Sequence, residues 1–181
     1  MENQKAGTQK LGACLNVETP ENAGECSAVR MTGRDPQKEN DLFFTCSLIE
    51  YMARKTKNHR VDVVRSLGRD AIGKIYDLAD VYHCENIDEV ADSFIEQAKI
   101  TEGSFDNVSS ARYIVPSHWD IGKVYKRLIL GIQKAEGVDV IEALWRAYES
   151  FVTEKIEDYN SAFYYDAPQN ILGAYLYGEI E

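Results

Sequence analysis

The chain has 181 residues, of which 30 are acidic and 20 basic, so its formal net charge is −10. This length suits one domain with a sizeable core, and the charge argues against a protein whose whole surface binds nucleic acid or anionic lipid, because both are polyanions. No apolar run approaches the ~20 residues that cross a bilayer. The N-terminus also lacks the charged and apolar regions of a signal peptide, so we expect a cytoplasmic protein.

Residues 1–39 differ in composition from the rest of the chain. They contain mainly Gly, Thr, Asn, Gln, Pro and Glu, and their apolar residues follow neither a helical nor a strand period. Such a segment buries too little apolar surface to offset the entropy lost when it is ordered. We therefore expect 1–39 to be a disordered or loosely attached tail, followed by a helical domain over 40–181.

The first half of this domain shows apolar stripes with helical spacing. The first helix is predicted from Asn40–Asp41, which can cap it, to about residue 57. A short helix over 61–67 is ended by Gly68, and a third begins at Asp70, another capping residue. After a break at 82–86, the clearest stripe of the chain predicts a helix over 87–98, and a loop follows at 103–110.

The second half begins with Tyr113–Val115, the one β-like run of the sequence. Three residues alone make no sheet, so we expect extended chain that crosses the helices. Ser117 and Asp120 have the spacing of a capping box, which opens a helix that stops before Gly137.

The last part of the chain predicts two more helices. Asp139 can cap a long helix to about residue 159, and Pro168 suits the first turn of a short final helix. Together the elements predict an all-α fold, a compact bundle of about six or seven helices. The segments 40–110 and 111–181 could be two sub-bundles, but a single core is favoured because each half alone is small.

The charge is arranged in blocks along the chain. Residues 40–69 carry net +3 and residues 111–134 net +4, whereas 70–110 and 135–181 carry −8 each. One interpretation is that basic helices lie against acidic ones and neutralise them. The other is an acidic surface that attracts a basic protein partner.

Aromatic residues are concentrated near the C-terminus, and the run 163–165 cannot all face one core. Exposed Tyr side chains anchor protein interfaces at a low entropy cost. The predicted partner-binding surface therefore combines acidic and aromatic residues: Asp77, Asp80, Glu85, Asp88, Glu89, Tyr164 and Tyr165.

A basic stretch over two predicted helices supports an alternative function. A helix, a turn and a second helix rich in Arg and Lys could contact DNA phosphates, as a DNA-binding regulator does; the other interpretation of the same residues is a solvated face. The candidate nucleic-acid-binding residues are Arg54, Lys55, Lys57, Arg60, Arg65 and Arg69.

Candidates for chemistry are weaker. The four cysteines lack the C-x-x-C spacing of zinc and redox sites: Cys14, Cys26, Cys46 and Cys84. Cys46 falls on an apolar helical stripe and is predicted to be a core residue. Neighbouring side chains such as His83 and Cys84 point apart on a regular element, and no spacing places His118 near Cys84, so we interpret Cys84 as a buried thiol at a helix end. The histidines are too dispersed to bind metal, and we expect no enzyme, no metal and no cofactor.

Three stretches of the sequence carry a resemblance: LFFTCSLIEY at 42–51, DVYH at 80–83 and VAD at 90–92. Over 41–97 the chain resembles an uncharacterised bacterial family of short helical proteins, often encoded beside toxin-like proteins that resemble ADP-ribosyltransferases. The motif is mainly a hydrophobic helix pattern. The resemblance implies a small partner-binding or antitoxin-like protein and assigns no catalytic residue.

Overall fold

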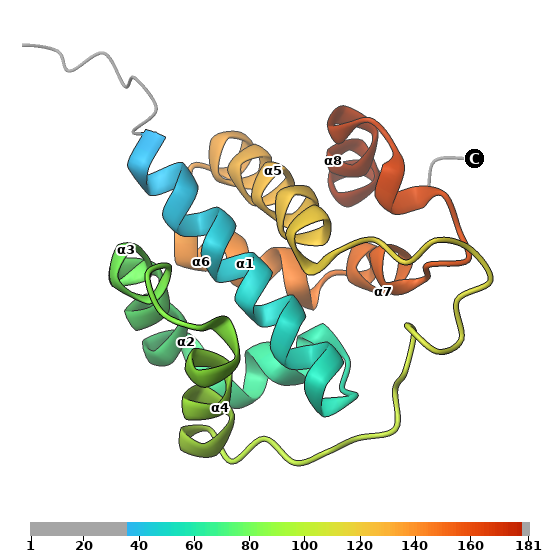
Figure 1. The fold of residues 1–181 in the computed structure, drawn as a ribbon. Helices are drawn as coiled ribbons and strands as arrows, with labels where there is room; N and C mark the ends of the chain where they lie inside the picture. Colours follow the sequence, from blue (N-terminus) through green and yellow to red (C-terminus); the bar gives the residue numbers. More distant parts are fainter. Residues whose placement is uncertain (1–35, 179–181) are drawn as a thin grey trace, which may run out of the picture. The chain divides into compact units, whose positions relative to one another are not determined.

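The computed structural model describes residues 36–178, and these form eight α-helices and one 3-10 helix (Figure 1). The elements are α1 (Pro36–Thr56), α2 (Arg60–Asp77), α3 (Ala79–Tyr82), α4 (Ile87–Gln97), α5 (His118–Glu136), α6 (Val140–Glu149), α7 (Phe151–Glu157), η1 (Phe163–Tyr165) and α8 (Pro168–Tyr177). They belong to one compact unit. Residues 1–35 of the predicted tail, with Cys14 and Cys26, lie outside the described residues.

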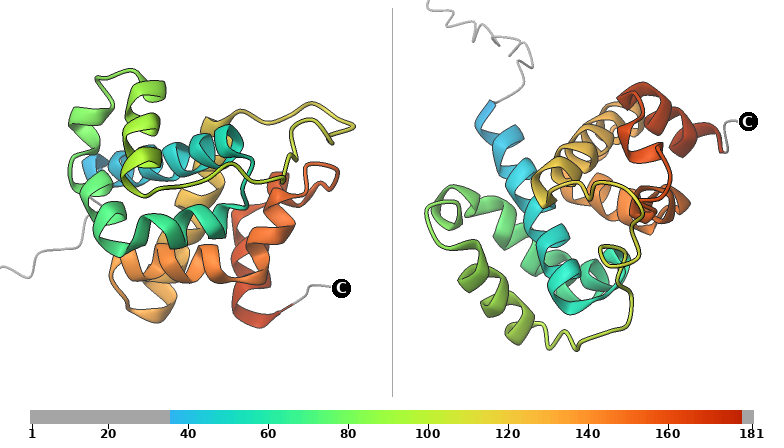
Figure 2. Two further views of the ribbon diagram at one scale, coloured as in Figure 1. Left: turned by 90° about the horizontal axis from the view of Figure 1, so that it is seen from below. Right: turned by 45° about the vertical axis from the view of Figure 1, so that its right-hand side comes forward.

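Helix α1 runs through the middle of this unit, with α2, α3 and α4 against one side of it and α5 against the other (Figure 1; Figure 2). Helices α5 and α6 pack together, and α6 also contacts α2, so these elements surround α1. Helix α8 packs on α5 and α7. The long connection over 98–117 returns the chain from α4 to α5.

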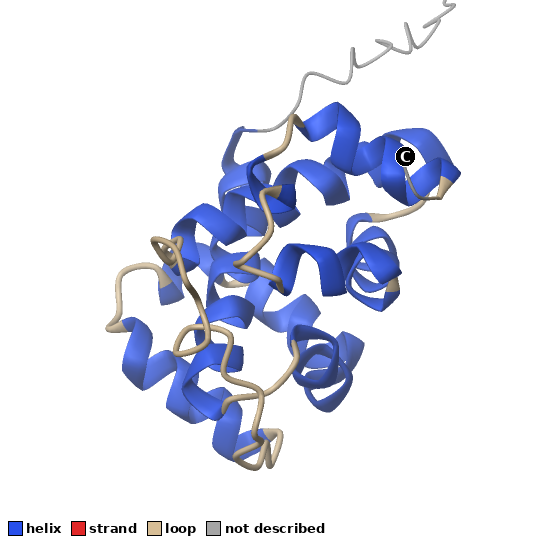
Figure 3. Ribbon diagram, turned by 90° about the vertical axis from the view of Figure 1, so that its right-hand side faces the viewer, coloured by secondary structure: helices blue, strands red, loops and turns tan. Residues whose placement is uncertain are grey.

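The described part of the chain contains helices and loops but no strand, which confirms the predicted all-α fold (Figure 3). The β-like run Tyr113–Val115 is irregular, and the side chains of Tyr113 and Ile114 are 69% and 87% exposed. Between residues 36 and 178, none of the helices combines the length and the apolar character that a bilayer crossing needs.

The start of α1 differs from the prediction. The helix begins at Pro36, so Asn40 and Asp41 lie within it and do not cap it. Asp41 is buried, and its carboxylate accepts a hydrogen bond from Gln37 Nε2 at 3.1 Å. The predicted cap is therefore wrong, because the helix begins upstream at Pro36, and Asp41 pairs instead with a side chain one helical turn earlier.

The other predicted helix ends agree better with the structure. Ser117 and Asp120 form the reciprocal capping box of α5, and the Asp139 carboxylate accepts from the first N–H groups of α6. Gly137 ends α5 with φ 67°, a left-handed conformation that glycine adopts without steric cost. Gly68 interrupts α2 with φ 71°, at the predicted break. Each of these residues controls a terminus through its own backbone or side chain.

The long helix predicted after Asp139 is divided in two at Ser150. This residue has an extended backbone with φ −81° and ψ 157°. Its hydroxyl donates to the carbonyl of Ala147 at 2.7 Å, and the Thr153 hydroxyl donates to the same oxygen at 3.0 Å. Serine and threonine hydroxyls compete for backbone carbonyls in this way, which explains why the apolar stripe continues while the helix does not.

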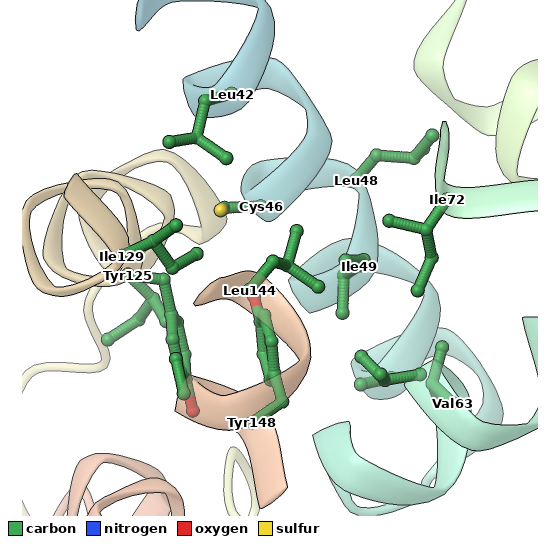
Figure 4. Packing of buried hydrophobic residues seen from close by; sticks show 14 of the residues in the cluster. Leu42, Cys46, Leu48, Ile49, Val63, Ile72, Tyr125, Ile129, Leu144 and Tyr148 are labelled. Atoms are coloured by element: carbon green, nitrogen blue, oxygen red, sulfur yellow. The ribbon is translucent and has the colours of Figure 1, made fainter. Parts of the chain in front are cut away.

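One apolar cluster joins the helices (Figure 4). The α1 stripe of Leu42, Cys46, Ile49 and Ala53 is fully buried, which confirms the prediction for Cys46. Residues from both halves of the chain, including α2, α4, α5, α6 and α8, complete the same cluster. Helices α1 and α5 approach closely at Gly122, where a Cβ atom would collide with Ser47 Oγ.

Candidate functional site

A group of buried polar side chains lies where the end of α1, the start of α2, the loop over 101–110 and the end of α7 meet. We call it the polar cluster; its members are Glu50, Arg54, Arg60, Asn107, Glu157 and Tyr159. Glu50, Arg60 and Glu157 are only 0%, 1% and 3% exposed. Charged groups are rarely buried this completely unless they are paired, so the partners of each one matter.

The chain turn after α1 brings two arginines to Glu50. Arg54 follows Glu50 by one helical turn on α1, and Lys57, with φ 50°, reverses the chain so that Arg60 returns to the same carboxylate. Glu50 Oε2 accepts from Arg60 Nε at 2.7 Å, and Oε1 accepts from Arg60 Nη2 at 2.6 Å. This two-point contact matches the geometry of a guanidinium to that of a carboxylate.

Further donors complete the environment of Glu50. Arg54 Nε and the Tyr159 hydroxyl both donate to Oε1 at 2.5 Å. Burial alone would raise the pKa of Glu50, but the charges of Arg60 and Arg54 and the hydrogen bonds from Arg60 and Tyr159 outweigh it and lower the pKa to about 2. Glu50 is therefore an anion held in the protein interior.

Glu157 forms the second centre of the polar cluster. Its Oε1 accepts from the backbone N–H of Arg60 at 2.6 Å, and its Oε2 lies 2.8 Å from His59 Nδ1. The imidazole of His59 is stacked on Phe105, with ring centroids 3.7 Å apart. Asn107 Nδ2 donates to the Glu157 carbonyl at 2.8 Å, which fixes the loop over 101–110 beside α7.

A cavity of about 810 Å³ opens next to the polar cluster. The residues of the polar cluster and its surroundings that line it are His59, Phe105, Asn107, Glu157 and Tyr159. Helix α2 adds Asp62 and Arg65, and the segment over 149–158 adds Glu149, Phe151, Glu154 and Asp158. A cavity of this size is in the usual range for a ligand site.

The polar cluster and the cavity differ in charge balance. In the cluster two arginines, Arg54 and Arg60, face two glutamates. In the cavity four further carboxylates, Asp62, Glu149, Glu154 and Asp158, face the single guanidinium of Arg65, which binds Glu149 with Nε and Nη2 both at 2.8 Å. The cavity therefore favours a cationic ligand.

The predicted partner-binding residues fall into two separate groups. Asp77, Asp80, Glu85, Asp88 and Glu89 are exposed along the end of α2, α3 and the start of α4. Asp88 already accepts from the Tyr51 hydroxyl at 2.6 Å and from Lys55 Nζ at 2.9 Å, and these hydrogen bonds lower its pKa.

The aromatic pair lies elsewhere, in η1. Tyr164 is buried and Tyr165 is 74% exposed, so only part of the aromatic run is on the surface, as predicted. Both residues line a smaller cavity of about 270 Å³ between α5 and the start of α8. None of the contacts among the described residues joins this pair to the acidic group.

The predicted nucleic-acid-binding residues are occupied by carboxylates of the same chain. Lys55 pairs with Asp88 and Asp92, Lys57 with Glu102, Arg65 with Glu149 and Arg69 with Glu142; these exposed pairs span 2.6 to 2.9 Å. Arg54 and Arg60 belong to the polar cluster. The interpretation of Arg60 as a surface residue is wrong, because burial against Glu50 removes it from solvent.

The cysteine and histidine candidates are dispersed. Cys46 is buried, and burial raises the pKa of its thiol to about 12, whereas Cys84 is exposed, contrary to the expectation of a buried thiol. His83 lies edge-on to Phe44, and His118 lies edge-on to Tyr51. Burial and the charge of Arg54 lower the pKa of His118. Among the described residues, no group of three or more metal-binding side chains occurs.

Sequence reasoning named Arg54 and Arg60 for a different role, DNA binding, and missed the other residues that build this site. Glu50 carried a usable signal, since it lies on the buried face of α1 between Cys46 and Ala53, where a charged side chain needs an internal partner. His59 and Glu157 carried none, because they are 98 positions apart in the chain. Searches of protein-family models, curated proteins and solved structures gave no match to this chain.

Proposed function

We propose that this chain is a non-enzymatic protein-interaction module that binds a basic partner. The carrying observation is the cavity beside the polar cluster, in which four carboxylates besides that of Glu157 face one guanidinium, and aromatic side chains form part of the wall. A protein segment rich in Arg or Lys matches this surface in charge.

The distribution of ion pairs supports the choice of a basic partner. The cations of the 54–69 stretch already have carboxylate partners within the chain, so their charge is largely neutralised. In contrast, Glu85, Glu89 and Glu154 are exposed and form no ion pair with a described residue. The field that reaches solvent from these regions is therefore negative, which accelerates association with cationic surfaces.

The resemblance over 41–97 narrows the kind of partner in this proposal. It points to a bacterial, intracellular protein of the antitoxin or inhibitor type, whose partner is a toxin-like enzyme with a basic surface. In this role the chain needs no cofactor, because occupying the partner's surface is sufficient for inhibition. Carboxylates presented by an inhibitor can substitute for the phosphates that a basic enzyme surface otherwise binds.

The competing hypothesis is a DNA-binding regulator, which predicts that the chain binds a DNA duplex and not a basic peptide. It requires the 54–69 stretch to contact phosphates, which means breaking the exposed pairs of Lys55, Lys57 and Arg65. Arg54 and Arg60 stay committed to Glu50 in either case. Exposed ion pairs contribute only about 0–1 kcal/mol each to stability, so DNA could displace them, and an experiment has to decide between the two hypotheses.

The test measures binding of the full chain to three fluorescent probes by anisotropy: an arginine-rich peptide, its glutamate-substituted counterpart and a DNA duplex. We expect binding to the arginine peptide that weakens with salt, and none to the other two. Binding of the duplex at physiological salt, or equal binding of both peptides, would overturn the proposal. A variant with Glu85→Gln and Glu89→Gln, compared with one carrying Glu154→Gln and Asp158→Asn, shows which acidic region binds the peptide.

A further inference from the structure

We infer that the smaller cavity between α5, η1 and the start of α8 docks an acidic peptide segment of a partner. One apolar side chain of the segment enters this cavity, and neighbouring carboxylates of the segment pair with Arg127 and Lys123. We call it the α5–α8 cavity. It shares no lining residue with the cavity beside the polar cluster, so the inference is independent of the proposed function.

The first step of the argument is the shape of the α5–α8 cavity. Helices α5 and α8 pack closely at Gly131, where a Cβ atom would lie 2.8 Å from Leu172 Cδ2 (Figure 1). The cavity opens from there toward the start of both helices. Its buried lining consists of Leu128, Tyr164 and Ile171, which are 1%, 6% and 3% exposed. An apolar side chain that enters the cavity therefore contacts residues that already pack in the core.

The second step is the size of the cavity. Its volume is about 270 Å³, slightly below the roughly 300–1,000 Å³ of sites that enclose a whole small molecule. A cavity of this size suits one large aliphatic side chain of a peptide. Tyr165 continues the apolar surface out to solvent, since it is 74% exposed and its ring centroid lies 4.5 Å from that of Tyr164. An exposed tyrosine beside such a cavity is typical of a protein-binding surface.

The third step is the charge at the opening of the cavity. Arg127 and Lys123 line the cavity one helical turn apart on α5, and both are exposed. Among the arginines on the described helices, Arg127 is the one without a carboxylate partner. Lys123 has a long contact only, with 3.4 Å between its Nζ and Asp120 Oδ1. Acidic side chains on a segment that lies across the cavity would supply the missing partners.

The same property extends over the basic block at 111–134, which carries net +4. The cations of the 54–69 stretch are paired within the chain. In contrast, Arg112, Arg127 and Lys134 are exposed and form no ion pair with a described residue. This second block therefore keeps a positive charge that reaches solvent, and a positive surface attracts an acidic segment.

Two carboxylates also line the α5–α8 cavity, and both are already hydrogen-bonded at helix N-termini. Asp120 accepts from the Ser117 N–H at 3.2 Å and from the Ser117 hydroxyl at 2.6 Å, and these hydrogen bonds lower its pKa. Asp166 accepts from the Ala167 N–H at 2.8 Å and from Asn170 Nδ2 at 2.9 Å. The positive ends of the two helix dipoles offset part of these negative charges. The unpaired guanidinium of the cavity has no such counter-charge among the described residues.

The experiment measures the fluorescence anisotropy of a labelled peptide in which one leucine lies between two pairs of glutamates. We expect the full chain to bind it with an affinity that falls as salt is added. Replacing the leucine by alanine should weaken binding by about tenfold or more, because most of the buried apolar side chain is lost. Replacing the glutamates by glutamines should weaken it by about two- to fivefold. Equal affinity for the leucine and alanine peptides would overturn the inference.

Substitutions at the opening of the cavity locate the binding. Arg127→Gln should weaken it by about two- to fivefold, and Tyr165→Ala by about fivefold or more, because an aromatic contact is lost. Both residues are exposed, so the urea midpoints should change little. The matched controls are Lys74→Gln, on an exposed lysine of α2 without an ion pair to a described residue, and Tyr177→Ala, on a tyrosine that is 87% exposed. Unchanged affinity in both cavity variants would overturn the docking site.

A third variant tests the volume of the cavity. Val124 is half-buried and lines the cavity, so Val124→Phe should fill part of it and weaken binding of the leucine peptide by about tenfold. Circular dichroism and the urea midpoint show whether this variant is folded. In the natural chain, the peptide should shift the NMR amide signals of α5, η1 and the start of α8. Shifts confined to residues around the cavity beside the polar cluster would overturn the proposed location.

Other occupants of the cavity give different results. N-acetyl-leucine carries the apolar side chain and one carboxylate; if it binds as tightly as the peptide, the cavity is a small-molecule site and the inference is wrong. If sedimentation shows a dimer that Tyr165→Ala dissociates, a second copy of the chain covers the cavity, and the inference is also wrong. Glu154→Gln should leave binding of the acidic peptide unchanged, so this experiment and that of the proposed function are decided separately.

Discussion

The polar cluster and the cavity beside it both contain carboxylates, but those of the cluster are buried and paired, whereas some of those at the cavity are exposed and unpaired with any described residue. Glu50 is sealed from solvent and accepts hydrogen bonds from Arg54, Arg60 and Tyr159. Glu154 faces solvent at the cavity and forms no ion pair with a described residue. A carboxylate is therefore available to a binding partner only where it is exposed to solvent, because water stabilises its charge when no cation is paired with it.

This difference also separates stability from binding. A buried charge without its partner destabilises the folded state by several kcal/mol, whereas an exposed charge contributes little to stability and much to the field outside the protein. Glu157 and His59 lie on the boundary, since the carboxylate belongs to the closed cluster and the imidazole lines the open cavity. Variants on the two sides of this boundary should therefore behave differently.

The largest effect is expected from Arg60→Met. This change leaves Glu50 buried without its two-point partner and should lower the free energy of unfolding by about 3–5 kcal/mol, measured by urea denaturation. The double variant with Glu50→Leu removes both charges and should be more stable than Arg60→Met alone. If Arg60→Met is as stable as the natural chain, the polar cluster is not closed in the way described.

Acid should break the same cluster next. The pKa of Glu50 is held at about 2, below its ordinary 4.5. Its stabilising contribution is therefore complete above about pH 4.5 and is lost as the pH falls toward 2. Urea midpoints measured across this range should fall steeply for the natural chain. The double variant that lacks Glu50 and Arg60 should show a shallower fall, and identical profiles would contradict this account.

A smaller loss is expected from Asn107→Ala. The Asn107 side chain is buried and donates to the Glu157 carbonyl, and its oxygen lies 3.4 Å from Arg60 Nη2. Leaving these groups without a partner should cost about 1–3 kcal/mol of unfolding free energy. Ser109→Ala, on the same loop but exposed, is the matched control and should lose less.

The smallest effect on stability is expected in the cavity itself. Glu154→Gln should change the unfolding free energy by less than about 0.5 kcal/mol, as exposed substitutions usually do. Calorimetry or urea denaturation can check this, and the same protein sample then serves in the binding titration. A large loss of stability would place Glu154 with the closed cluster and remove it from the proposed site.

The parts of the fold that the sequence predicted are those decided locally. The caps at Ser117, Asp139 and Gly137 act within a few residues, so their positions could be read directly. The helix after Asp139 ends at Ser150 although its apolar stripe continues beyond this residue. It ends there because the hydroxyl groups of Ser150 and Thr153 compete for the Ala147 carbonyl. Such competition is visible only when the carbonyl's other partners are known.

The candidate site was less predictable for a related reason. Glu50 could have been suspected from its place on a buried stripe, but its partner Tyr159 is 109 positions away, and Glu157 is 97 positions from Arg60. Charge counting over blocks of sequence could not tell that the basic stretch is neutralised internally. It also could not tell that Glu154 and Asp158 lie beside a cavity, because that proximity arises from the packing of the helices.

The exposed turn at Tyr113–Ile114 has a consequence for dividing the chain. Cutting the backbone between these two residues would separate α1–α4 from α5–α8. Helix α1 is nevertheless packed along α5, and both groups of helices share one apolar cluster. Neither fragment can bury its half of that cluster alone, so the fragments 1–113 and 114–181 should reassociate when they are produced together. The two pieces would then act as complementing fragments, and the regained fluorescence of a split reporter would follow their reunion in a living cell.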